Sequence, residues 1–507
     1  MSTSPGVKPG ACFRFDHFEN RSRTWAWPHA SPLCSCKIED KRIKELEARV
    51  ASLMERIAEL ELALAKANKD SSTSSKPPSS DIAKPKPKTR PGRPRKPRQG
   101  GQLGHQRQLR EPLPPDRVDN TIDYEIDDAE VQRLGLTPTG NFEVIQHIEL
   151  PESPAIVTEH RLTEYVDAAG YLYYPDASEL KGPIFGPRLL ATIGWLKSVG
   201  HCSYSTVEMW MEDILQVPVS RGYLAKLCNG TIADSLDDAY NELVEAIPQQ
   251  PQLGSDETSI KDNGKTHWIW CITAAAFSVF HIDATRSRAV LEKLVGDEFA
   301  GYLNFDYFSA NCSFAWNYCV KAQYCWAHLI RDIRFLEKHP DKKTRLWAEQ
   351  LLSRSRRLFS AWHTRDEMTD EGFHRSMLTH RNRFMELIGN APSTKEAQNL
   401  AARFRTVQYT SDECDTPQNY DLSEDYFRFM FTAGVEPTNN HSEQQIRHCV
   451  IDRRITQGTR GKAGQRYHER MWTMIATCKK QNRNVFSFLQ ASITAKLNNQ
   501  QTPSLLV

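Results

Sequence analysis

The stretch between residues 252 and 338 constrains the fold of this chain more than any other part of its sequence. Three apolar segments follow one another there with the alternation of β-strands, and an Asn-Gly pair at Asn263 and Gly264 joins the first two. Asn-Gly is the strongest short-range hairpin signal, because both residues tolerate positive φ. A helix, two short strands and a second helix are predicted next, over residues 287–295, 301–310, 322–327 and 328–338.

Three antiparallel strands followed by helix, strand, strand and helix is the element order of a ribonuclease-H-like core. In such a sheet the middle of the first strand lies beside the end of the fourth. This order places Asp256 beside Asp306, fifty residues further on (306 − 256). A third acid, Glu443, falls in the first turns of a helix predicted over residues 438–450, 137 residues later (443 − 306).

Converging carboxylates of this kind are what metal-dependent cleavage of DNA requires. Two divalent ions about 3.5–4 Å apart stabilise the attacking and the leaving oxygen, and hard oxygen ligands suit Mg²⁺. Each acid taken alone is as well explained by a solvated surface position, but all three fall where one metal site needs them. Glu257 and Glu436 are rival ligands, and Glu257 points to the face of its strand opposite Asp256.

The amino-terminal part contains a heptad pattern over residues 38–67, after a leader at residues 1–37 to which we assign no fold. β-Branched and leucine residues alternate at spacings of three and four, which favours a parallel coiled-coil dimer. The alternative is one amphipathic helix packed on a globular body. The residues of the pattern are Ile43, Leu46, Val50, Leu53, Ile57, Leu60 and Leu64.

A linker with a basic arm is predicted over residues 68–99, because its Ser/Pro-rich first half cannot bury a core. Residues 84–98 hold eight Lys or Arg and no acid, around a Pro-Gly-Arg-Pro-Arg sequence that resembles an AT-hook. Arginines of such a motif lie along narrow minor grooves. The alternatives are a nonspecific tail or a nuclear-localisation-like run. The predicted DNA contacts here are Arg90, Arg93, Arg95, Lys96 and Arg98.

The remaining segments complete a multidomain α+β chain. Residues 100–183 predict a small β-rich module, and residues 184–250 a helical region in which helix, turn and helix follow one another, with Ser220 as an N-cap. The helix-turn-helix either contacts DNA or is an ordinary helical hairpin. The catalytic core would occupy residues 251–339 and resume at 431–497. Residues 340–430 are predicted to be an all-helical insertion that interrupts it.

Composition limits the setting rather than the activity. The formal charge is only +2 and the twelve cysteines are scattered, which fits reduced cysteines in a reducing compartment. No apolar run approaches the ~20 residues that cross a bilayer, so we expect a soluble protein without a membrane partner.

Several motifs in this order resemble the transposases of the insertion sequence 66 family, a bacterial DDE group. The resemblance covers roughly residues 40–490. The motifs are SSKPPSSD (74–81), GGQLGH (100–105), DET (256–258) with the strand WIW (268–270), FDYFSAN (305–311), CWAHLIRDIR (325–334), EPTNNHSEQQIR (436–447) and ATCKKQNRNVFSFL (476–489).

The resemblance implies a catalytic triad of Asp256, Asp306 and Glu443 holding two Mg²⁺ or Mn²⁺ ions. It implies that water first frees a 3′-hydroxyl at the terminal inverted repeats of the element, and that this hydroxyl then attacks target DNA. It also implies small companion proteins of the same element and a cytoplasmic, nucleoid-associated location in a bacterium.

Further polar residues near these motifs are candidates for supporting roles. His328 and Arg331 either contact phosphate or support the triad, or else form the solvated start of a helix. Asn439 and its neighbour Asn440 either orient Glu443 or cap its helix. A basic run follows, which either tracks a DNA backbone or is a solvated loop. It contains Arg453, Arg454, Arg460, Lys462 and Arg466, of which Arg454, Arg460 and Lys462 are the predicted DNA contacts.

One departure from the family concerns zinc. Members usually carry a cysteine-rich, zinc-finger-like module after the GGQLGH segment, whereas residues 106–201 here contain no cysteine. A four-cysteine site cannot form there, so we expect no structural zinc. Two alternatives to an active transposase remain: a catalytically inert or domesticated dimeric DNA-binding protein, and a nuclease that hydrolyses DNA without joining strands.

Overall fold

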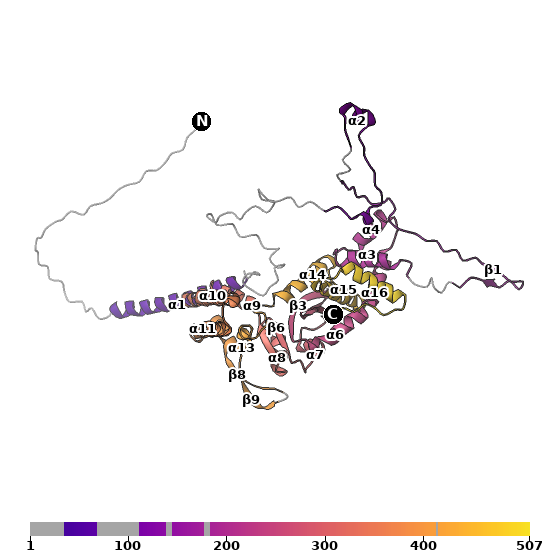
Figure 1. The fold of residues 1–507 in the computed structure, drawn as a ribbon. Coiled ribbons are helices and arrows are strands. Elements are labelled where there is room, and N and C mark those ends of the chain that lie inside the picture. The colour runs from indigo at the N-terminus through magenta and orange to yellow at the C-terminus, as the bar shows by residue number, and fades with distance from the viewer. Residues whose placement is uncertain (1–34, 68–110, 138–143, 177–182, 412–413, 507) are drawn as a thin grey trace, which may run out of the picture. The chain divides into compact units, whose positions relative to one another are not determined.

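The computed structural model describes residues 35–67, 111–137, 144–176, 183–411 and 414–506 (Figure 1). The chain separates into two compact units, Met1–Asn68 and Lys69–Val507. Most of the predicted leader, the linker and the basic arm lie outside the described residues. The predicted DNA contacts Arg90, Arg93, Arg95, Lys96 and Arg98 are therefore not placed.

The first unit contains one helix, α1 (Ser35–Ala67), where the heptad pattern predicts it. All seven residues of the pattern are at least half exposed, from 50% for Val50 to 63% for Leu64. The helix thus carries an apolar seam on its surface. Whether a second copy pairs with this seam stays a prediction.

The centre of the second unit is a five-stranded sheet of order β5-β4-β3-β6-β7. Its strands are β3 (Gln252–Asp262), β4 (Lys265–Thr273), β5 (Ser278–Asp283), β6 (Tyr302–Phe305) and β7 (Lys321–Tyr324). The first three are antiparallel, and β6 and β7 extend the sheet in parallel from β3. The predicted turn is present, with positive φ at Asn263 (48°) and Gly264 (79°). The predicted order of elements is present except that a helix, not predicted, separates β6 from β7.

The predicted fourth strand is wrong in its length. It was expected to run through Ala310, but β6 ends at Phe305 and the chain enters a helix, α8 (Ser309–Asn317). The neighbouring strand β7 has only four residues and pairs no further than Phe305. Asp306 therefore lies one residue beyond the last paired residue of β6, at the carboxyl end of that strand.

Helices near the sheet come from segments before and after residues 340–430 in the chain. Those nearest the site are α7 (Arg288–Val295), α9 (Trp326–Leu336), α14 (Asn440–Thr456), α15 (Lys462–Lys480) and α16 (Val485–Leu497). Apolar residues of β3, β4 and β5 form a buried core with Ile446 and Cys449 of α14 and Trp472 of α15. This core holds the carboxyl-terminal helices against strands that lie almost 200 residues earlier in the chain.

Helix α15 also closes the edge of the sheet. Three side chains spaced four residues apart on it accept hydrogen bonds from alternate N–H groups of β5: Glu469 from Ile282 (2.7 Å), Thr473 from Phe280 (3.0 Å) and Thr477 from Ser278 (3.2 Å). The unpaired backbone groups of an edge strand can otherwise pair with a strand of another molecule. Here its outward-facing donors are satisfied within the molecule.

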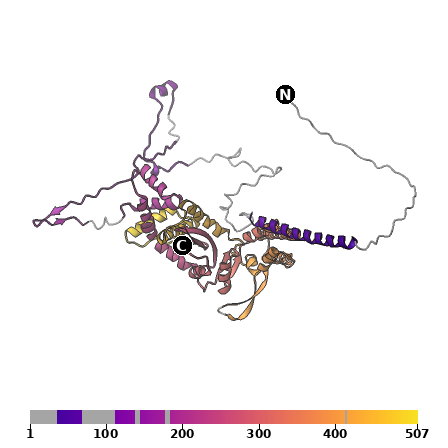
Figure 2. The ribbon, with the colours of Figure 1, turned by 180° about the vertical axis from the view of Figure 1, so that it is seen from behind.

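Residues 184–250 are helical, as predicted. They form α3 (Pro187–Ser198), α4 (Tyr204–Asp213), α5 (Arg221–Leu227), a π-helical turn (Cys228–Ile232) and α6 (Asp237–Ala246). The predicted cap is confirmed, because the hydroxyl of Ser220 accepts from the N–H of Tyr223 at 3.3 Å. Helix α3 packs against α16, at the yellow end of the colour scale, as both ribbon views show (Figures 1 and 2).

The prediction of an all-helical insertion over residues 340–430 is wrong. It begins with α10 (Lys342–His363), α11 (Asp370–Gly389) and α12 (Lys395–Ala401), and α13 (Glu424–Phe427) closes it. Between α12 and α13, β8 (Thr406–Ser411) and β9 (Cys414–Asp421) form an antiparallel hairpin. The alternation in TVQYTS favours a strand, but the long helical patterns before it obscured this short signal.

The predicted β-rich module also differs from the structure. In residues 111–137 and 144–176 the regular elements are α2 (Asp128–Leu134), a 3₁₀ turn (Pro115–Arg117) and two paired strands of two residues each, β1 (Tyr165–Val166) and β2 (Leu172–Tyr173). Apolar side chains there are exposed, up to 98% for Ile156. The apolar stretches are too short to cover one another, so alternation alone did not produce a packed sheet.

Across the helices that the structure describes, none combines the length and the apolar composition needed to cross a membrane.

Candidate active site

The three predicted catalytic acids come from three separate elements. Asp256 lies in the middle of β3, Asp306 directly follows β6, and Glu443 lies in the first turn of α14. Strands β3 and β6 are parallel neighbours, with Gly254 paired to Asn304. Each aspartate lies two residues beyond that pair, so the two acids lie at the same level of the sheet.

A short segment before α14 is tied across the ends of the strands. The side chain of Asn304 donates to the carbonyls of Glu436 (2.8 Å) and Thr438 (3.2 Å). The N–H of Trp326, at the start of α9, donates to the carbonyl of Pro437 at 2.9 Å. Asn304 is nearly fully buried, and its amide sets where the chain crosses from the insertion to α14.

Asn439 settles one of the alternatives left open by the sequence. It occupies the N-cap position of α14, yet its side chain makes no capping bond. Instead its amide donates to the carbonyl of Ser255 at 2.7 Å, directly beside Asp256. The backbone N–H of Glu443 donates to the carbonyl of Asn439 at 3.1 Å. Asn439 thus fixes the start of the Glu443 helix against β3.

Gly254 permits this close approach. A Cβ atom added there would lie 2.4 Å from Oγ of Ser442 and 3.0 Å from Oδ1 of Asn439. Contacts below 3.0 Å force neighbouring atoms to move, so a side chain at this position would displace the Ser442 hydroxyl and press on Asn439.

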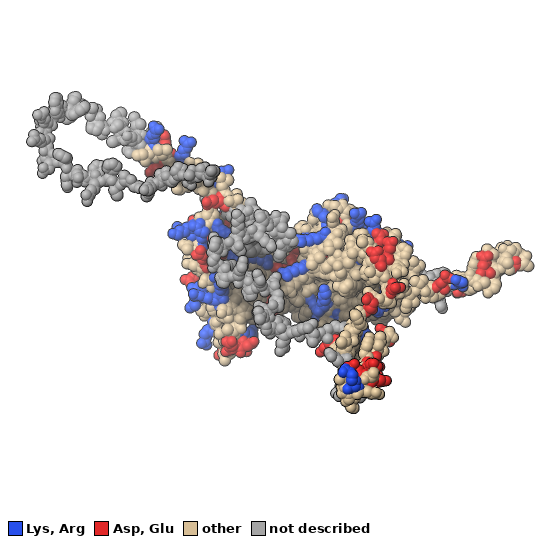
Figure 3. All heavy atoms as spheres, turned by 90° about the horizontal axis from the view of Figure 1, so that it is seen from above, with Lys and Arg blue, Asp and Glu red and all other residues tan. Residues whose placement is uncertain are grey.

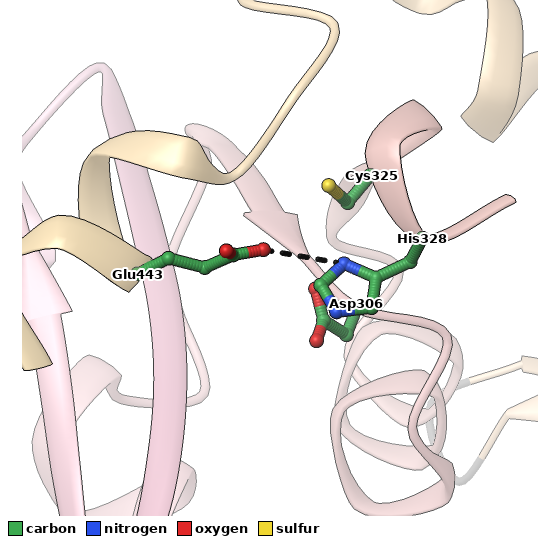
Figure 4. A group of neighbouring side chains, drawn as sticks. All are labelled: Asp306, Cys325, His328 and Glu443. Carbon is green, nitrogen blue, oxygen red and sulfur yellow. Dashed lines mark ion pairs between the residues drawn. The ribbon is translucent and has the colours of Figure 1, made fainter. Parts of the chain in front are cut away.

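Asp306, His328 and Glu443 meet around one point (Figure 4). His328 Nδ1 lies 2.8 Å from Oδ1 of Asp306 and 3.5 Å from Oε1 of Glu443. Together with Cys325, these residues offer ligand atoms that all lie within 4.8 Å of one another, a group able to hold a metal ion. The sequence did not single out Cys325. Its signal was its position directly after a buried strand, in the CWAH motif.

Asp256 is not one of the residues whose ligand atoms lie within 4.8 Å of one another, but it is close enough to be affected by their charges. Burial raises the pKa of this carboxyl well above its usual value, and the negative charges of Asp306, Glu257 and Glu443 raise it further. Carboxylates brought together in this way repel one another unless a cation joins them. Three hard oxygen donors are the ligand type that Mg²⁺ or Mn²⁺ prefers, so the residues fit such ions.

His328 and Arg331 line the site from α9. Arg331 lies 2.9 Å from Nε2 of His328 and 3.4 Å from Oε2 of Glu443. Burial lowers the pKa of His328, but its hydrogen bonds to Asp306 and Cys325 outweigh burial and bring the pKa to about 11. His328 is buried, which does not fit the alternative of a solvated helix start. Both side chains contact the acids directly.

The two rival ligands lie elsewhere. Glu257 pairs with Arg286, whose Nε lies 3.1 Å from Oε1 of the acid. The guanidinium of Arg286 in turn lies 3.7 Å from the centre of the Phe308 ring. Burial raises the pKa of Glu257 while Arg286 opposes that shift. Glu436 is exposed and contributes its backbone carbonyl rather than its carboxylate to the site.

The predicted basic run divides into two groups. Arg453 donates to Oγ1 of Thr258 at 2.9 Å, and Arg466 pairs with Asp234 and Asp237. These two arginines hold the protein together, which corrects their assignment to a DNA-tracking loop. The other three members of the run are exposed: Arg454, Arg460 and Lys462. Of these, Lys462 lies at the start of α15 and not in the loop.

Asp262 anchors the loop that carries Arg460. Its Oδ1 accepts from the hydroxyl of Thr459 and from the N–H of Gly461, both at 2.7 Å. Gly458 has φ of 113°, and a Cβ there would lie 2.0 Å from the carbonyl oxygen of Lys261. The loop is therefore docked on the β3–β4 turn. Among the atoms coloured in Figure 3, basic side chains form several separate groups with acidic ones between them.

Comparison with protein families gives the class to which this fold and site belong. Residues 182–467, more than half of the 507 residues, match the transposase IS66 family, and residues 28–111 match a family of unknown function. No match was found among proteins of curated function. The chain belongs to the transposase IS66 family.

Proposed function

We propose that this protein is a DNA transposase of the DDE type, with a ribonuclease-H-like core, that cleaves and joins DNA at the ends of its element. The observation that carries the proposal is the cluster of Asp306, His328 and Glu443, beside which Asp256 lies on the neighbouring strand and is affected by the charges of both acids. The sheet order β5-β4-β3-β6-β7 and membership of a transposase family support it.

Each acid has a defined place in the proposed chemistry. Asp256, Asp306 and Glu443 would hold two Mg²⁺ or Mn²⁺ ions, which supply Lewis-acid stabilisation of the attacking and leaving oxygens when bound. His328 lies with Nδ1 2.8 Å from Oδ1 of Asp306, where a protonated imidazole would attract that carboxylate and hold it in place. Arg331 lies against Glu443 and presents a guanidinium to the phosphate of a bound strand.

The proposed reaction consists of two phosphodiester exchanges. In the first, water attacks phosphorus at the end of the element, its oxygen joins the phosphate, and the 3′-oxygen leaves as a hydroxyl. In the second, that hydroxyl attacks a phosphodiester of target DNA, forming one P–O bond as another breaks. The number of phosphodiester bonds does not change in the second step, so it needs no other co-reactant.

We assign DNA contacts to two basic regions. Exposed Arg454, Arg460 and Lys462 would meet the phosphate backbone, and the arm with Arg90, Arg93, Arg95, Lys96 and Arg98 would enter a minor groove. Neutralising phosphates makes such binding depend on salt. The small companion proteins of the element and its place on the bacterial nucleoid belong to the same proposal.

The exposed seam of α1 is proposed to pair with a second copy in parallel. β-Branched residues at one core position and leucines at the other favour a two-stranded coiled coil. A transposase must bring two element ends together, and a dimer supplies two DNA-binding arms for that task.

The test uses a labelled duplex carrying the DNA that flanks the gene, with Mg²⁺ or Mn²⁺ and the companion proteins. Wild type is compared with Asp306→Asn and with Asp370→Asn, whose side chain is 98% exposed on α11. We expect nicking at one end, lowered at least about 100-fold by Asp306→Asn, because several kcal/mol of charge stabilisation are lost. Asp370→Asn should act as wild type.

Three results would redirect the proposal. Binding without nicking by wild type favours the inert DNA-binding protein. Nicking without joined products favours a nuclease. Nicking that survives Asp306→Asn removes the triad from the mechanism.

A further inference from the structure

We propose that His201, His448 and Asp452 form a second metal site, which takes Zn²⁺ or a similar divalent transition ion. One ligand atom from each of the three side chains lies within 4.8 Å of the others. None of the three belongs to the cluster around Asp306, and the site goes beyond the proposed transposase chemistry.

The three residues come from two distant segments. His448 and Asp452 are four residues apart on α14 and so share one face of that helix. His201 lies between α3 and α4 with φ of 54°, in the left-handed region that non-glycine residues rarely adopt. The His201 and His448 rings lie with centroids 4.4 Å apart. A strained backbone residue thus places its imidazole beside the α14 pair.

His448 is prepared as a ligand. Within the described residues its Nε2 is buried without a hydrogen-bond partner, while the ring also faces the Ser198 carbonyl. The unpartnered Nε2 is the ring atom that a metal ion could occupy. Metal-binding histidines commonly donate their other ring N–H to a carbonyl in this way.

Hydrogen bonds to two other side chains fix the orientation of the Asp452 carboxylate. Its Oδ2 accepts from Nε1 of Trp472 at 2.6 Å, and its Oδ1 lies 2.5 Å from Nδ1 of His201. Zinc ligands at ~2.0 Å in a tetrahedral site lie roughly 3.3 Å apart, so these two atoms need to separate by less than about 1 Å. The Trp472 bond holds the carboxylate while that adjustment takes place.

The buried carboxylate of Asp452 lies against the imidazole of His201, and Lys197 is a further basic group whose charge acts on it. The ammonium of Lys197 is buried and, within the described part of the chain, has no hydrogen-bond partner. A bound divalent ion would balance the carboxylate charge.

The ligand set indicates the kind of ion. Two imidazoles and one carboxylate match zinc sites with three protein ligands and one open position, whereas Mg²⁺ prefers oxygen ligands throughout. A cavity of about 290 Å³ lies beside His448, and its lining also includes Trp472 and the two lysines Lys479 and Lys480.

An ion at this site would join the loop before α4 to the helix that carries Glu443. Sequence spacing could not reveal it, because His201 and His448 are 247 residues apart (448 − 201). The expectation of no structural zinc concerned a four-cysteine module. The proposal revises that expectation for a different set of ligands.

The test measures zinc bound to the full-length protein after chelation and dialysis. The starting variant is Asp306→Asn with Cys325→Ser, which removes two ligands of the other cluster. We expect one Zn²⁺ per chain in this background and a rise in its unfolding midpoint with zinc. His448→Ala should abolish both effects. His201→Asn, which tolerates positive φ, should weaken binding at least about tenfold.

Co²⁺ provides an independent readout. Imidazole and carboxylate ligands give visible d–d bands, and thiolate adds an ultraviolet charge-transfer band. The site should give the first without the second. The proposal is overturned if the starting variant binds no zinc at micromolar concentration, or if His448→Ala and His201→Asn, shown folded by circular dichroism, bind it unchanged. Mg²⁺-dependent nicking by wild type is a separate measurement, so failure here leaves the transposase proposal standing.

Discussion

At the scale of single residues, the site depends on the absence of a side chain at Gly254. Gly254 lets Ser442 and Asn439 lie against β3, and Glu443 follows them directly in the chain. Any side chain at this position would push the start of α14 away from Asp256 and Asp306. The distance between the acids is therefore set by a residue that takes no part in the chemistry.

Gly254→Ala should reduce nicking at least about tenfold and destabilise the protein by ~1–3 kcal/mol, as overpacking does. The control is Gly222→Ala in α5, where an added Cβ meets nothing within 4 Å in the described structure. Duplex nicking and urea unfolding measure the two effects. Equal activity of both variants would show that α14 can shift without cost.

Asn439→Ala should lower the rate of nicking more than it lowers DNA affinity. The change removes the bond to the Ser255 carbonyl and leaves Glu443 free to move from the acids, while no predicted DNA contact is altered. Single-turnover rates and a binding titration separate the two quantities. A loss of affinity at an unchanged rate would assign Asn439 to DNA binding instead.

The residues of the candidate site divide by how far they could be predicted. Asp256 and Asp306 are predicted from strand order, because parallel pairing of β3 and β6 fixes which of their residues share a level, and Glu443 is predicted from its place in a helix after the insertion. Asn304 and Cys325 could not be predicted, since their roles come from where residues 436–439 cross the sheet. The sequence carries no local signal for a contact between segments 130 residues apart.

At the scale of elements, the exposed seam of α1 leads to a prediction about mass. Leu53→Arg should convert a dimer to a monomer, because it places a charge in the predicted core of the coiled coil. Ala51→Arg, outside the seam on the same exposed helix, is the matched control. Light scattering after gel filtration gives the mass of each. An unchanged mass for Leu53→Arg would exclude dimerisation through the heptads.

The loop at residues 457–461 should become mobile in acid. Burial raises the pKa of Asp262, but bonds from Thr459 and Gly461 outweigh it, so the folded pKa lies below the usual value. The docking energy is therefore present above the ordinary aspartate pKa of about 3.9 and is lost as the pH falls through the folded value. Asp262→Ala should remove it at every pH.

Hydrogen exchange at the Gly461 N–H measures this docking. We expect faster exchange in Asp262→Ala than in wild type at pH 7, and weaker binding of DNA if Arg460 contacts it. Lys261→Ala, next to Asp262, is the control. Slow exchange in Asp262→Ala would show that the loop is held by its backbone bonds, from the Asn263 N–H to the Thr459 carbonyl and from the Thr459 N–H to the Lys261 carbonyl.

Features that depend on neighbouring residues were predicted better than features that depend on distant contacts. The heptads, the Asn-Gly turn and the Ser220 cap each have a local cause, and all three features are present as expected, although pairing of the heptads is untested. The β8–β9 hairpin and the end of β6 depend on partners elsewhere in the chain. Residues 111–176 show the opposite error, in which alternation was present without a surface to cover.

At the scale of the whole molecule, the two compact units predict separable properties. Removing residues 1–68 should leave the unfolding midpoint of the rest unchanged, while lowering the yield of joined products more than that of nicks. Joining requires two ends at once, whereas nicking requires one. Calorimetry and product analysis on gels measure the two. A large fall in the midpoint would show that the first unit stabilises the second.

The bonding of β5 to α15 has a consequence for the history of the element. A copy interrupted by a stop codon before residue 462 would make a chain whose β5 edge is bare, since Glu469, Thr473 and Thr477 are absent. Bare edges invite aggregation. Such a truncated protein would precipitate and so would not compete for the DNA ends. Truncation from the carboxyl end would therefore inactivate one copy without inhibiting the intact copies.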